Sequence, residues 1–356
     1  MTDTRPTRLE IIRERTKEIA LAVIALAMLA VSAPAFSEDK PVFVGPHNFV
    51  RAETNRYMES LVNRASHGEV YSRREPTDLA SQHVIRMNLD TLYSMGVFDM
   101  EAGPVTITVP TAPDGRYVSA QVLNQDHLTA KVFYSGTHTF TAKDVGTRYA
   151  AVLVRVFANA VDQDDISYAN EVQDMIETSQ PSMGEFTVPE YDDESFDETR
   201  KLLLRLAALA RGNFGVKMGT ADEIDPVSHL IITAVGWGLL PESAADYFGG
   251  QPEPGNKDIP HELILKDVPV KGFWSVTVYN KRGFMVPNEL GVNALNNVNA
   301  TKSADGSYRI QLGGCKADTV NCIPTPENWN YTLRTYQPGE EILSGKWKAP
   351  AIKPIK

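Results

Sequence analysis

Residues 105–109 read Val-Thr-Ile-Thr-Val, and this alternation of apolar and polar β-branched side chains is typical of a half-buried strand. Segments of the same character follow along the chain at 117–123, 131–134 and 151–157. Pro-Asp-Gly at 113–115 and Ser-Gly-Thr at 135–137 provide turns between them. The sequence therefore predicts an N-terminal, antiparallel β-rich domain over residues 41–160. One amphipathic helix is expected at the start of this domain.

Alternation with period two returns near the C-terminus, at residues 273–279, 308–312 and 331–336. Between the two β-rich regions, apolar residues recur at helical spacing, and helices are expected over about 164–179, 194–211 and 225–239. The expected fold class is α+β and β-rich. Its parts are the N-terminal domain, a helical connecting block over 161–255 and a C-terminal jelly-roll-like β-sandwich over 256–350.

The first 35 residues have the pattern of a secretory signal. Five basic residues precede the uncharged segment Ile19–Val31, and Ala33 and Ala35 provide small residues for cleavage before Phe36. The apolar segment is 13 residues long, shorter than the roughly 20 that span a bilayer. We expect a periplasmic or secreted protein, and the alternative is an inner-membrane anchor that holds the protein facing the periplasm.

Composition excludes some classes of partner and predicts one cross-link. The formal net charge is −10 and no basic cluster is present, which argues against nucleic acid as a partner. Cys315 and Cys322 are the two cysteines, and in an oxidising compartment their spacing predicts a disulfide across a short loop. No metal-binding spacing and no cofactor motif occurs, so neither a metal nor a cofactor is predicted. A homo-oligomer is compatible with the sequence.

One segment is richer in hydrogen-bonding groups than a strand requires: Arg86-Met-Asn88-Leu-Asp90-Thr-Leu-Tyr93-Ser94. Read with a period of two, Arg86, Asn88 and Asp90 project to one side. Together with Tyr93 they predict one polar site near the junction of the two β domains. Two interpretations remain open: a ligand-binding site, or a structural network in which Arg86 pairs with Asp90.

A second candidate follows a predicted strand, where His127 stands beside Asp126. This pair has the groups of a general acid–base catalyst, although adjacent side chains usually point apart. Aromatic residues of the C-terminal strands offer a third candidate, because Trp274, Tyr279 and Trp329 could stack on sugar rings. Their alternative role is to fill the core of the sandwich.

Two of these segments also carry a family resemblance. Asn88-Leu-Asp-Thr-Leu-Tyr-Ser94 resembles the core motif of domain-of-unknown-function family 1254. Gly272–Tyr279 and Glu327-Asn-Trp329 resemble motifs of the companion family 1214, although Asn-Tyr follows Trp329 where Leu-Pro is frequent. The resemblance implies exported, β-rich bacterial proteins whose second domain is similar to a jelly roll. It implies no established reaction, so no catalytic residue is carried over.

Three functions are therefore compatible with the sequence. The first is an envelope protein that binds a small polar or carbohydrate-like ligand. The second is a hydrolase with Asp90, Asp126 or His127 as acid–base groups. The third is a purely structural envelope protein. They differ in whether the segment 86–93 lines a pocket or lies buried with its polar groups satisfied.

Overall fold

The computed structural model describes residues 40–64, 66–82, 85–210, 212, 214–253 and 259–355. The expected signal segment 1–35 lies outside them. From Phe43 onward the described residues belong to one compact unit. Within the described ranges, no helix is long and apolar enough to span a bilayer.

The N-terminal domain consists of two antiparallel sheets. The larger has the order β1-β2-β7-β4-β5, and the smaller has the order β6-β3-β8. Their strands are β1 (Tyr71–Ser72), β2 (Thr91–Asp99), β3 (Val105–Val109), β4 (Val118–Asn124), β5 (Thr129–Phe133), β6 (Gly136–Phe140), β7 (Tyr149–Phe157) and β8 (Glu177–Ser179). The expected strands 105–109, 117–123, 131–134 and 151–157 thus correspond to β3, β4, β5 and β7.

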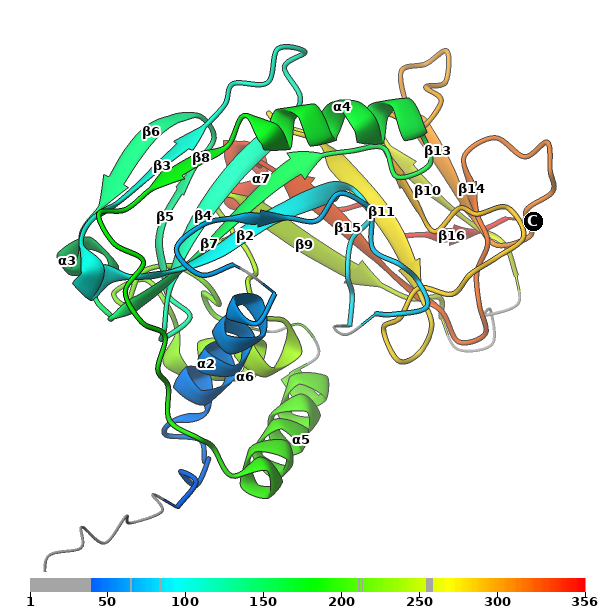
Figure 1. Ribbon diagram of the computed structural model, residues 1–356. Coiled ribbons are helices and arrows are strands. Elements are labelled where there is room, and N and C mark those ends of the chain that lie inside the picture. The colour runs from blue at the N-terminus through cyan, green and yellow to red at the C-terminus, as the bar shows by residue number, and fades with distance from the viewer. Residues whose placement is uncertain are drawn as a thin grey trace, which may run out of the picture. The chain divides into compact units, whose positions relative to one another are not determined.

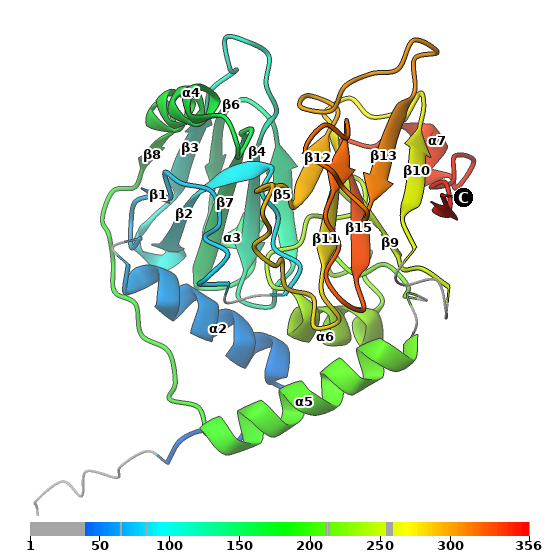
Figure 2. The same ribbon diagram turned by 90° about the vertical axis from the view of Figure 1, so that its right-hand side faces the viewer.

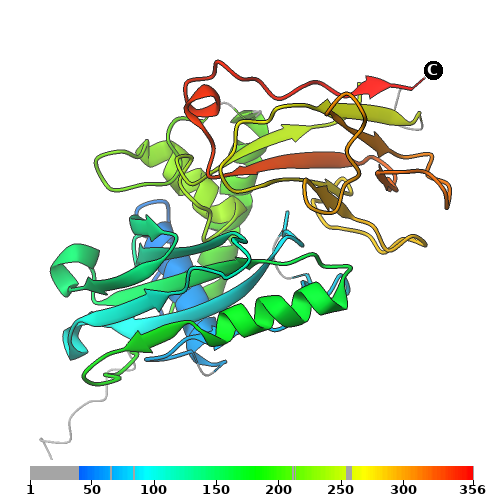
Figure 3. The same cartoon turned by 90° about the horizontal axis from the view of Figure 1, so that it is seen from above.

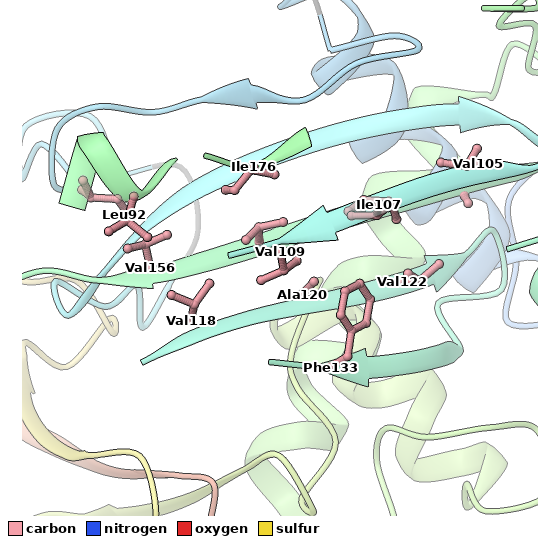
Figure 4. Packing of buried hydrophobic residues seen from close by; sticks show 14 of the residues in the cluster. Leu92, Val105, Ile107, Val109, Val118, Ala120, Val122, Phe133, Val156 and Ile176 are labelled. Atoms are coloured by element: carbon pink, nitrogen blue, oxygen red, sulfur yellow. The ribbon is translucent and has the colours of Figure 1, made fainter. Parts of the chain in front are cut away.

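The two faces of the larger sheet pack on different partners. Val118, Ala120 and Val122 of β4 meet Val105, Ile107 and Val109 of β3 in one apolar core (Figure 4). Helix α4 (Gln163–Asp174) contributes to the same core, and so do Val145 of the short α3 (Ala142–Val145) and Met100 of the 3₁₀ turn Met100–Ala102. On β7 the alternate residues Ala151 and Leu153 belong to a second core, beneath α2 (Phe49–Val62). Because side chains alternate along a strand, β7 is buried on both faces.

The C-terminal domain is a β-sandwich of two four-stranded sheets, β12-β11-β15-β9 and β14-β13-β10-β16. Its elements are β9 (Ala245–Gly250), β10 (His261–Leu265), β11 (Trp274–Tyr279), β12 (Ala294–Asn296), β13 (Tyr308–Leu312), β14 (Cys322–Ile323), β15 (Asn330–Tyr336), α7 (Glu340–Leu343) and β16 (Lys353–Pro354). Leu263 and Leu312 of one sheet share a core with Val276 and Leu333 of the other. The expected disulfide between Cys315 and Cys322 is confirmed, with Cα atoms 5.6 Å apart.

Helices α2, α5 (Asp193–Ala210) and α6 (Pro226–Val235) lie together at one end of both β domains (Figures 1 and 2). Figure 3 shows α4 on the opposite side of the N-terminal sheet, away from the sandwich. Asp225 caps α6 by accepting a hydrogen bond from the Ser228 amide, and Pro226 occupies the first turn. The fold class expected from the sequence, α+β with two β-rich regions and a helical block between them, is confirmed.

Four local expectations differ from the structure. Helix α4 ends at Asp174, five residues before the expected end, and Glu177–Ser179 form β8. Residues 85–90 form turns instead of a strand, because Arg86 has a φ of 56° and β2 begins only at Thr91. Helix α6 ends at Val235, four residues before the expected end, since Gly236 adopts an extended conformation. Strand β9 lies inside the range expected to be helical and pairs with β15 of the sandwich.

Candidate ligand-binding site

A cavity of about 470 Å³ lies where the two β domains and the helices meet. The N-terminal sheet lines it through β2 and β7, and the sandwich lines it through β9 and β15. Helices α2 and α6, together with residues 236–239, complete the wall. The volume falls within the range of about 300–1,000 Å³ that is usual for sites of small molecules.

Each sheet contributes a tyrosine and an arginine that stand directly opposite each other on neighbouring strands. In the N-terminal sheet Tyr93 on β2 pairs in register with Arg155 on β7. In the sandwich Tyr247 on β9 pairs in register with Arg334 on β15. All four side chains line the cavity. Cross-strand partners lie on the same face of a sheet, so the register places each tyrosine beside its arginine, and the packing of the two sheets brings both pairs to one cavity.

Arg155 is the central cation of the N-terminal half. It is 4% exposed, and its Nη2 donates to the carbonyl oxygen of Gly238 at 2.5 Å. Its Nη1 makes no hydrogen bond of normal geometry among the described residues, no described carboxylate forms an ion pair with it, and the Tyr93 side chain interacts with the guanidinium. Burial alone would lower the pKa of Arg155, but Tyr93, Tyr247 and Tyr117 raise it. The guanidinium is therefore charged and has a donor available for a ligand.

Arg334, in contrast, is held by protein groups. Its Nη1 donates to Thr277 Oγ1 at 2.9 Å, and its Nη2 donates to the Tyr279 hydroxyl at 2.6 Å and the Arg86 carbonyl at 2.7 Å. Burial would lower its pKa, whereas Tyr279, Tyr336 and Asp90 raise it. Arg334 thus contributes fixed positive charge to the cavity and positions the turn that contains Arg86.

Asn88 connects the two halves of the site. Its Oδ1 accepts hydrogen bonds from the amides of Asp90 (3.1 Å) and Thr91 (3.3 Å), which fixes the orientation of the side-chain amide. Its Nδ2 then donates to the hydroxyl oxygens of Tyr93 at 3.2 Å and Tyr336 at 3.3 Å. Each hydroxyl oxygen therefore acts as an acceptor toward Asn88 and keeps its own proton to donate.

The pKa values of Tyr336 and Tyr93 are shifted in opposite directions. Burial raises the pKa of Tyr336 well above its ordinary value of 10, so it stays a neutral donor. Burial also acts to raise the pKa of Tyr93, but the positive charge of Arg155, hydrogen bonds with Arg155 and Thr91, and the charge of Arg334 together lower the net pKa. A more acidic phenol is a stronger hydrogen-bond donor to an anionic oxygen.

Residues 236–238 form one wall of the cavity. Trp237 stacks on Tyr57 of α2, with ring centroids 4.8 Å apart and an interplanar angle of 8°. The Gly238 amide donates to His127 Nε2 at 2.8 Å, and the Gly238 carbonyl accepts from Arg155. Gly238 has a φ of 78°, and a Cβ there would lie 2.9 Å from Leu153 Cδ2. Glycine is therefore required at this position.

The structure separates the six residues that the sequence singled out. Arg86, Asn88 and Tyr93 line the cavity. Asp90 lies behind it, 1% exposed, where its Oδ1 accepts from Asn296 Nδ2 at 3.3 Å. Burial raises the pKa of the Asp90 carboxyl. The expected pairing of Asp90 with Arg86 is wrong, because Arg334 is the cation whose charge acts on Asp90, and Arg86 Nη1 lies 3.4 Å from Thr332 Oγ1.

Asp126 and His127 are not among the residues that line the cavity, and they do not interact as an acid–base pair. Asp126 forms a bidentate ion pair with Arg51, at 2.8 and 2.7 Å. His127 is fully buried, with Nδ1 2.9 Å from Thr233 Oγ1. Because Nε2 accepts from Gly238 and the Thr233 hydroxyl donates to the His229 carbonyl, His127 is the neutral Nδ1–H tautomer. Its role is to position the Gly238 loop.

The aromatic residues of the sandwich are core residues. Trp274 is 3% exposed and Trp329 is 2% exposed, and both belong to the core between the two sheets. The Tyr279 hydroxyl donates to the Met87 carbonyl at 2.7 Å. None of the three lines the cavity, so they provide no stacking surface for a sugar there.

Sequence reasoning missed Arg155, Arg334, Tyr247, Tyr336 and Trp237. A signal was present for the two arginines, since each interrupts a strand that is otherwise apolar or polar without charge: Ala-Val-Leu-Val-Arg-Val-Phe and Tyr-Thr-Leu-Arg-Thr-Tyr. An arginine at the centre of a doubly buried strand requires a polar destination. Which partner strand faces it depends on register, which a single sequence does not provide.

Metal binding has no support in the part of the chain that the structure describes. It contains no group of three or more His, Cys, Asp or Glu side chains arranged to hold an ion.

Comparison with known proteins follows the division into two β domains. Residues 67–144 match the family model described as Protein of unknown function (DUF1254), and residues 245–340 match the model described as Protein of unknown function (DUF1214). The chain resembles both families. The resemblance expected from the motifs is confirmed, in the expected order. No curated protein sequence matches the chain significantly.

Two solved structures share the fold. The VPA0106 protein from Vibrio parahaemolyticus is 18% identical, with a TM-score of 0.65, over 87% of this chain and 98% of that chain. An uncharacterized protein from Burkholderia cenocepacia is 13% identical, with a TM-score of 0.52, over 86% of this chain and 87% of that chain. At these identities the likeness concerns the fold alone.

The buried His127 predicts a specific dependence of stability on pH. Burial lowers the pKa of His127 well below 6.5, and the neighbouring His229 adds to the effect. The unfolded chain then binds this proton more tightly than the folded protein, so its contribution to stability is complete above about pH 6.5 and is lost as the pH falls. We expect up to about 1.4 kcal/mol lost per pH unit below that value. Urea unfolding of wild type and His127→Gln, at pH values above and below 6.5, measures this loss of stability. If the free energy of unfolding depends on pH equally in the two proteins, the assignment to His127 is contradicted.

Proposed function

We propose that the protein is an exported bacterial envelope protein that binds a small organic anion in the cavity between its two β domains. The observation that carries the proposal is the unpartnered Nη1 of the buried Arg155. Burying a guanidinium without a counter-charge costs several kcal/mol, and a site retains such a group when a ligand supplies the missing charge.

The other cavity residues support the sign of the ligand. Arg86 and Lys217 also line the cavity, and no aspartate or glutamate is among the described residues that do. Lys217 pairs with Glu242, so its charge is partly neutralised. The hydroxyls of Tyr93 and Tyr336 add two neutral donors. A site that offers donors and lacks charged acceptors favours an anion over a sugar, whose hydroxyl groups need both.

The hydrolase interpretation has less support. Of its three candidate acid–base residues, none is among the residues that line the cavity. Asp126 is engaged by Arg51, and His127 is locked as a neutral tautomer by its two hydrogen bonds. A purely structural role leaves the cavity and the free donor of Arg155 unexplained.

Anion binding is tested by thermal shift with carboxylates and phosphate, each beside a neutral analogue of the same shape. At a concentration of about 100 Kd, a bound anion stabilises the fold by about 2.7 kcal/mol. In Arg155→Met we expect the shift to disappear. We also expect the unliganded variant to be as stable as wild type or up to about 4 kcal/mol more stable, because an unpaired buried charge is removed.

Arg116→Met is the matched control. Arg116 is also largely buried, but it pairs with Asp114 and Asp165 outside the proposed site. This variant is expected to be less stable than wild type and to keep the anion-induced shift. Wild type that responds to no anion, or Arg155→Met that responds fully, would refute the proposal.

Export is proposed on the N-terminal pattern together with the disulfide, which is typical of an oxidising compartment. We expect a mature periplasmic protein that begins at Phe36, because Ala33 and Ala35 suit the cleavage site. Intact-mass spectrometry of the periplasmic fraction checks this. A mass that includes residues 1–35 would favour the membrane-anchored alternative.

The C-terminal sandwich has two facing sheets of four strands each. This is the strand number of a jelly roll. We therefore propose the jelly-roll class for this domain.

A further inference from the structure

The polarity of the cavity changes along the strands that line it. Tyr93 and Arg155 are cross-strand partners, and two residues further along the same strands Met95 and Leu153 are partners in the same way. All four line the cavity. Residues two apart point to the same face and are separated by about 7 Å along the strand. A charged pair and an apolar pair therefore stand side by side within one site.

The polar end consists of hydrogen-bond donors. Among the described residues Arg155 Nη1 makes no hydrogen bond of normal geometry, and the Tyr336 hydroxyl accepts from Asn88 and keeps its proton for another acceptor. Tyr336 is 2% exposed and Arg155 is 4% exposed, so both donors are almost completely removed from bulk water. Buried donors that line one cavity suit the oxygens of an anionic head group.

The apolar end is made by helices and the Gly238 loop. Met95, Leu153, Trp237 and Leu239 pack around Met58 and Leu61 of α2 in one cluster. Ile232 and Val235, from the last turns of α6, extend the same wall. The C-terminal end of a helix carries partial negative charge, so an anionic group is disfavoured beside α6. The charges at the two ends therefore define the orientation of the ligand.

We propose that the cavity binds an amphipathic monocarboxylic acid, with its carboxylate at Arg155 and Tyr336 and its apolar body between Met95, Leu153 and Trp237. This rests on the proposed anion-binding function and names its ligand class. A phosphate group has three terminal oxygens and usually takes several backbone amides or a helix N-terminus. Here the helix that reaches the cavity with its end, α6, presents its C-terminus.

The inference is tested by calorimetric titration of the purified protein with a series of linear carboxylates, from acetate upward in steps of one methylene. Each methylene that enters the apolar end should improve Kd about fourfold, until the cavity is filled. Three further series separate the alternatives: primary amides with the same chains, alkyl phosphates and short dicarboxylates. We expect each of these to bind at least about tenfold more weakly than the matched monocarboxylate.

Two variants locate the ends of the ligand. Tyr336→Phe should weaken every carboxylate by about tenfold, independent of chain length, because it removes one donor to the head group. Met95→Gln should reduce the gain in affinity per methylene, because it makes the apolar end polar at nearly constant volume. Tyr308→Phe is the control for loss of a hydroxyl, since Tyr308 donates to the Asn297 carbonyl in the sandwich, away from the cavity lining.

The outcomes separate the two levels of the proposal. If no anion of any series binds, both the anion-binding function and the ligand class fail. If carboxylates bind with an affinity that does not depend on chain length, anion binding stands and the amphipathic class is wrong. Tighter binding of alkyl phosphates or dicarboxylates than of monocarboxylates also overturns the class. If the primary amides bind as tightly as the matched carboxylates, Arg155 does not recognise a negative charge, and both the anion-binding function and the ligand class are contradicted.

Discussion

The site depends on one constraint, a guanidinium placed on β7, the central strand of its sheet, which is buried on both faces. Arg155 is held there by the Gly238 carbonyl and lies over the ring of Tyr93, 5.3 Å from its centroid. Hydrogen bonds to one carbonyl do not satisfy the five N–H groups of an arginine. The elements around this residue supply dipoles and aromatic faces to it, and one side of it lines the cavity.

The arrangement propagates outward through the Gly238 loop. His127, neutral and buried, accepts from the Gly238 amide, and the carbonyl oxygen of the same residue accepts from Arg155. Trp237 in the same loop is fixed by stacking on Tyr57 and by an indole hydrogen bond to Thr54 at 3.3 Å. One short loop therefore sets both the direction of the cation and the apolar wall beside it, and it couples α2 to the central strand of the N-terminal sheet.

The sequence predicted the architecture well because hydrophobic alternation is local. The strand at 105–109 matches β3 to the residue, and Asp225-Pro226 marks the start of α6. The segment 86–90 was wrongly interpreted as a strand, because polar and apolar residues can also alternate by chance in a turn. The positive φ of Arg86 decides the local structure there, and the residue type gives no indication of that backbone conformation.

Only part of the candidate site could be predicted from the sequence. Asn88 and Tyr93 were found because polar residues are dense in one segment. Arg155 and Arg334 are 179 positions apart, lie in two different sheets and line the same cavity only because those sheets pack together. Asp126 and His127 are adjacent in sequence yet serve a surface ion pair and a loop, respectively. Long-range register, more than residue type, decides which polar groups share a cavity.

The central claim is that an anion occupies the cavity beside Arg155, and a crystal structure with a halogen-substituted carboxylate tests it most directly. The anomalous signal of the halogen locates the ligand independently of any prior placement. The account predicts a single peak between the Tyr93–Arg155 pair and Trp237, with the carboxylate within hydrogen-bond distance of Arg155 Nη1. Crystals grown at saturating ligand with an empty cavity, or with peaks confined to the outer surface, would contradict it.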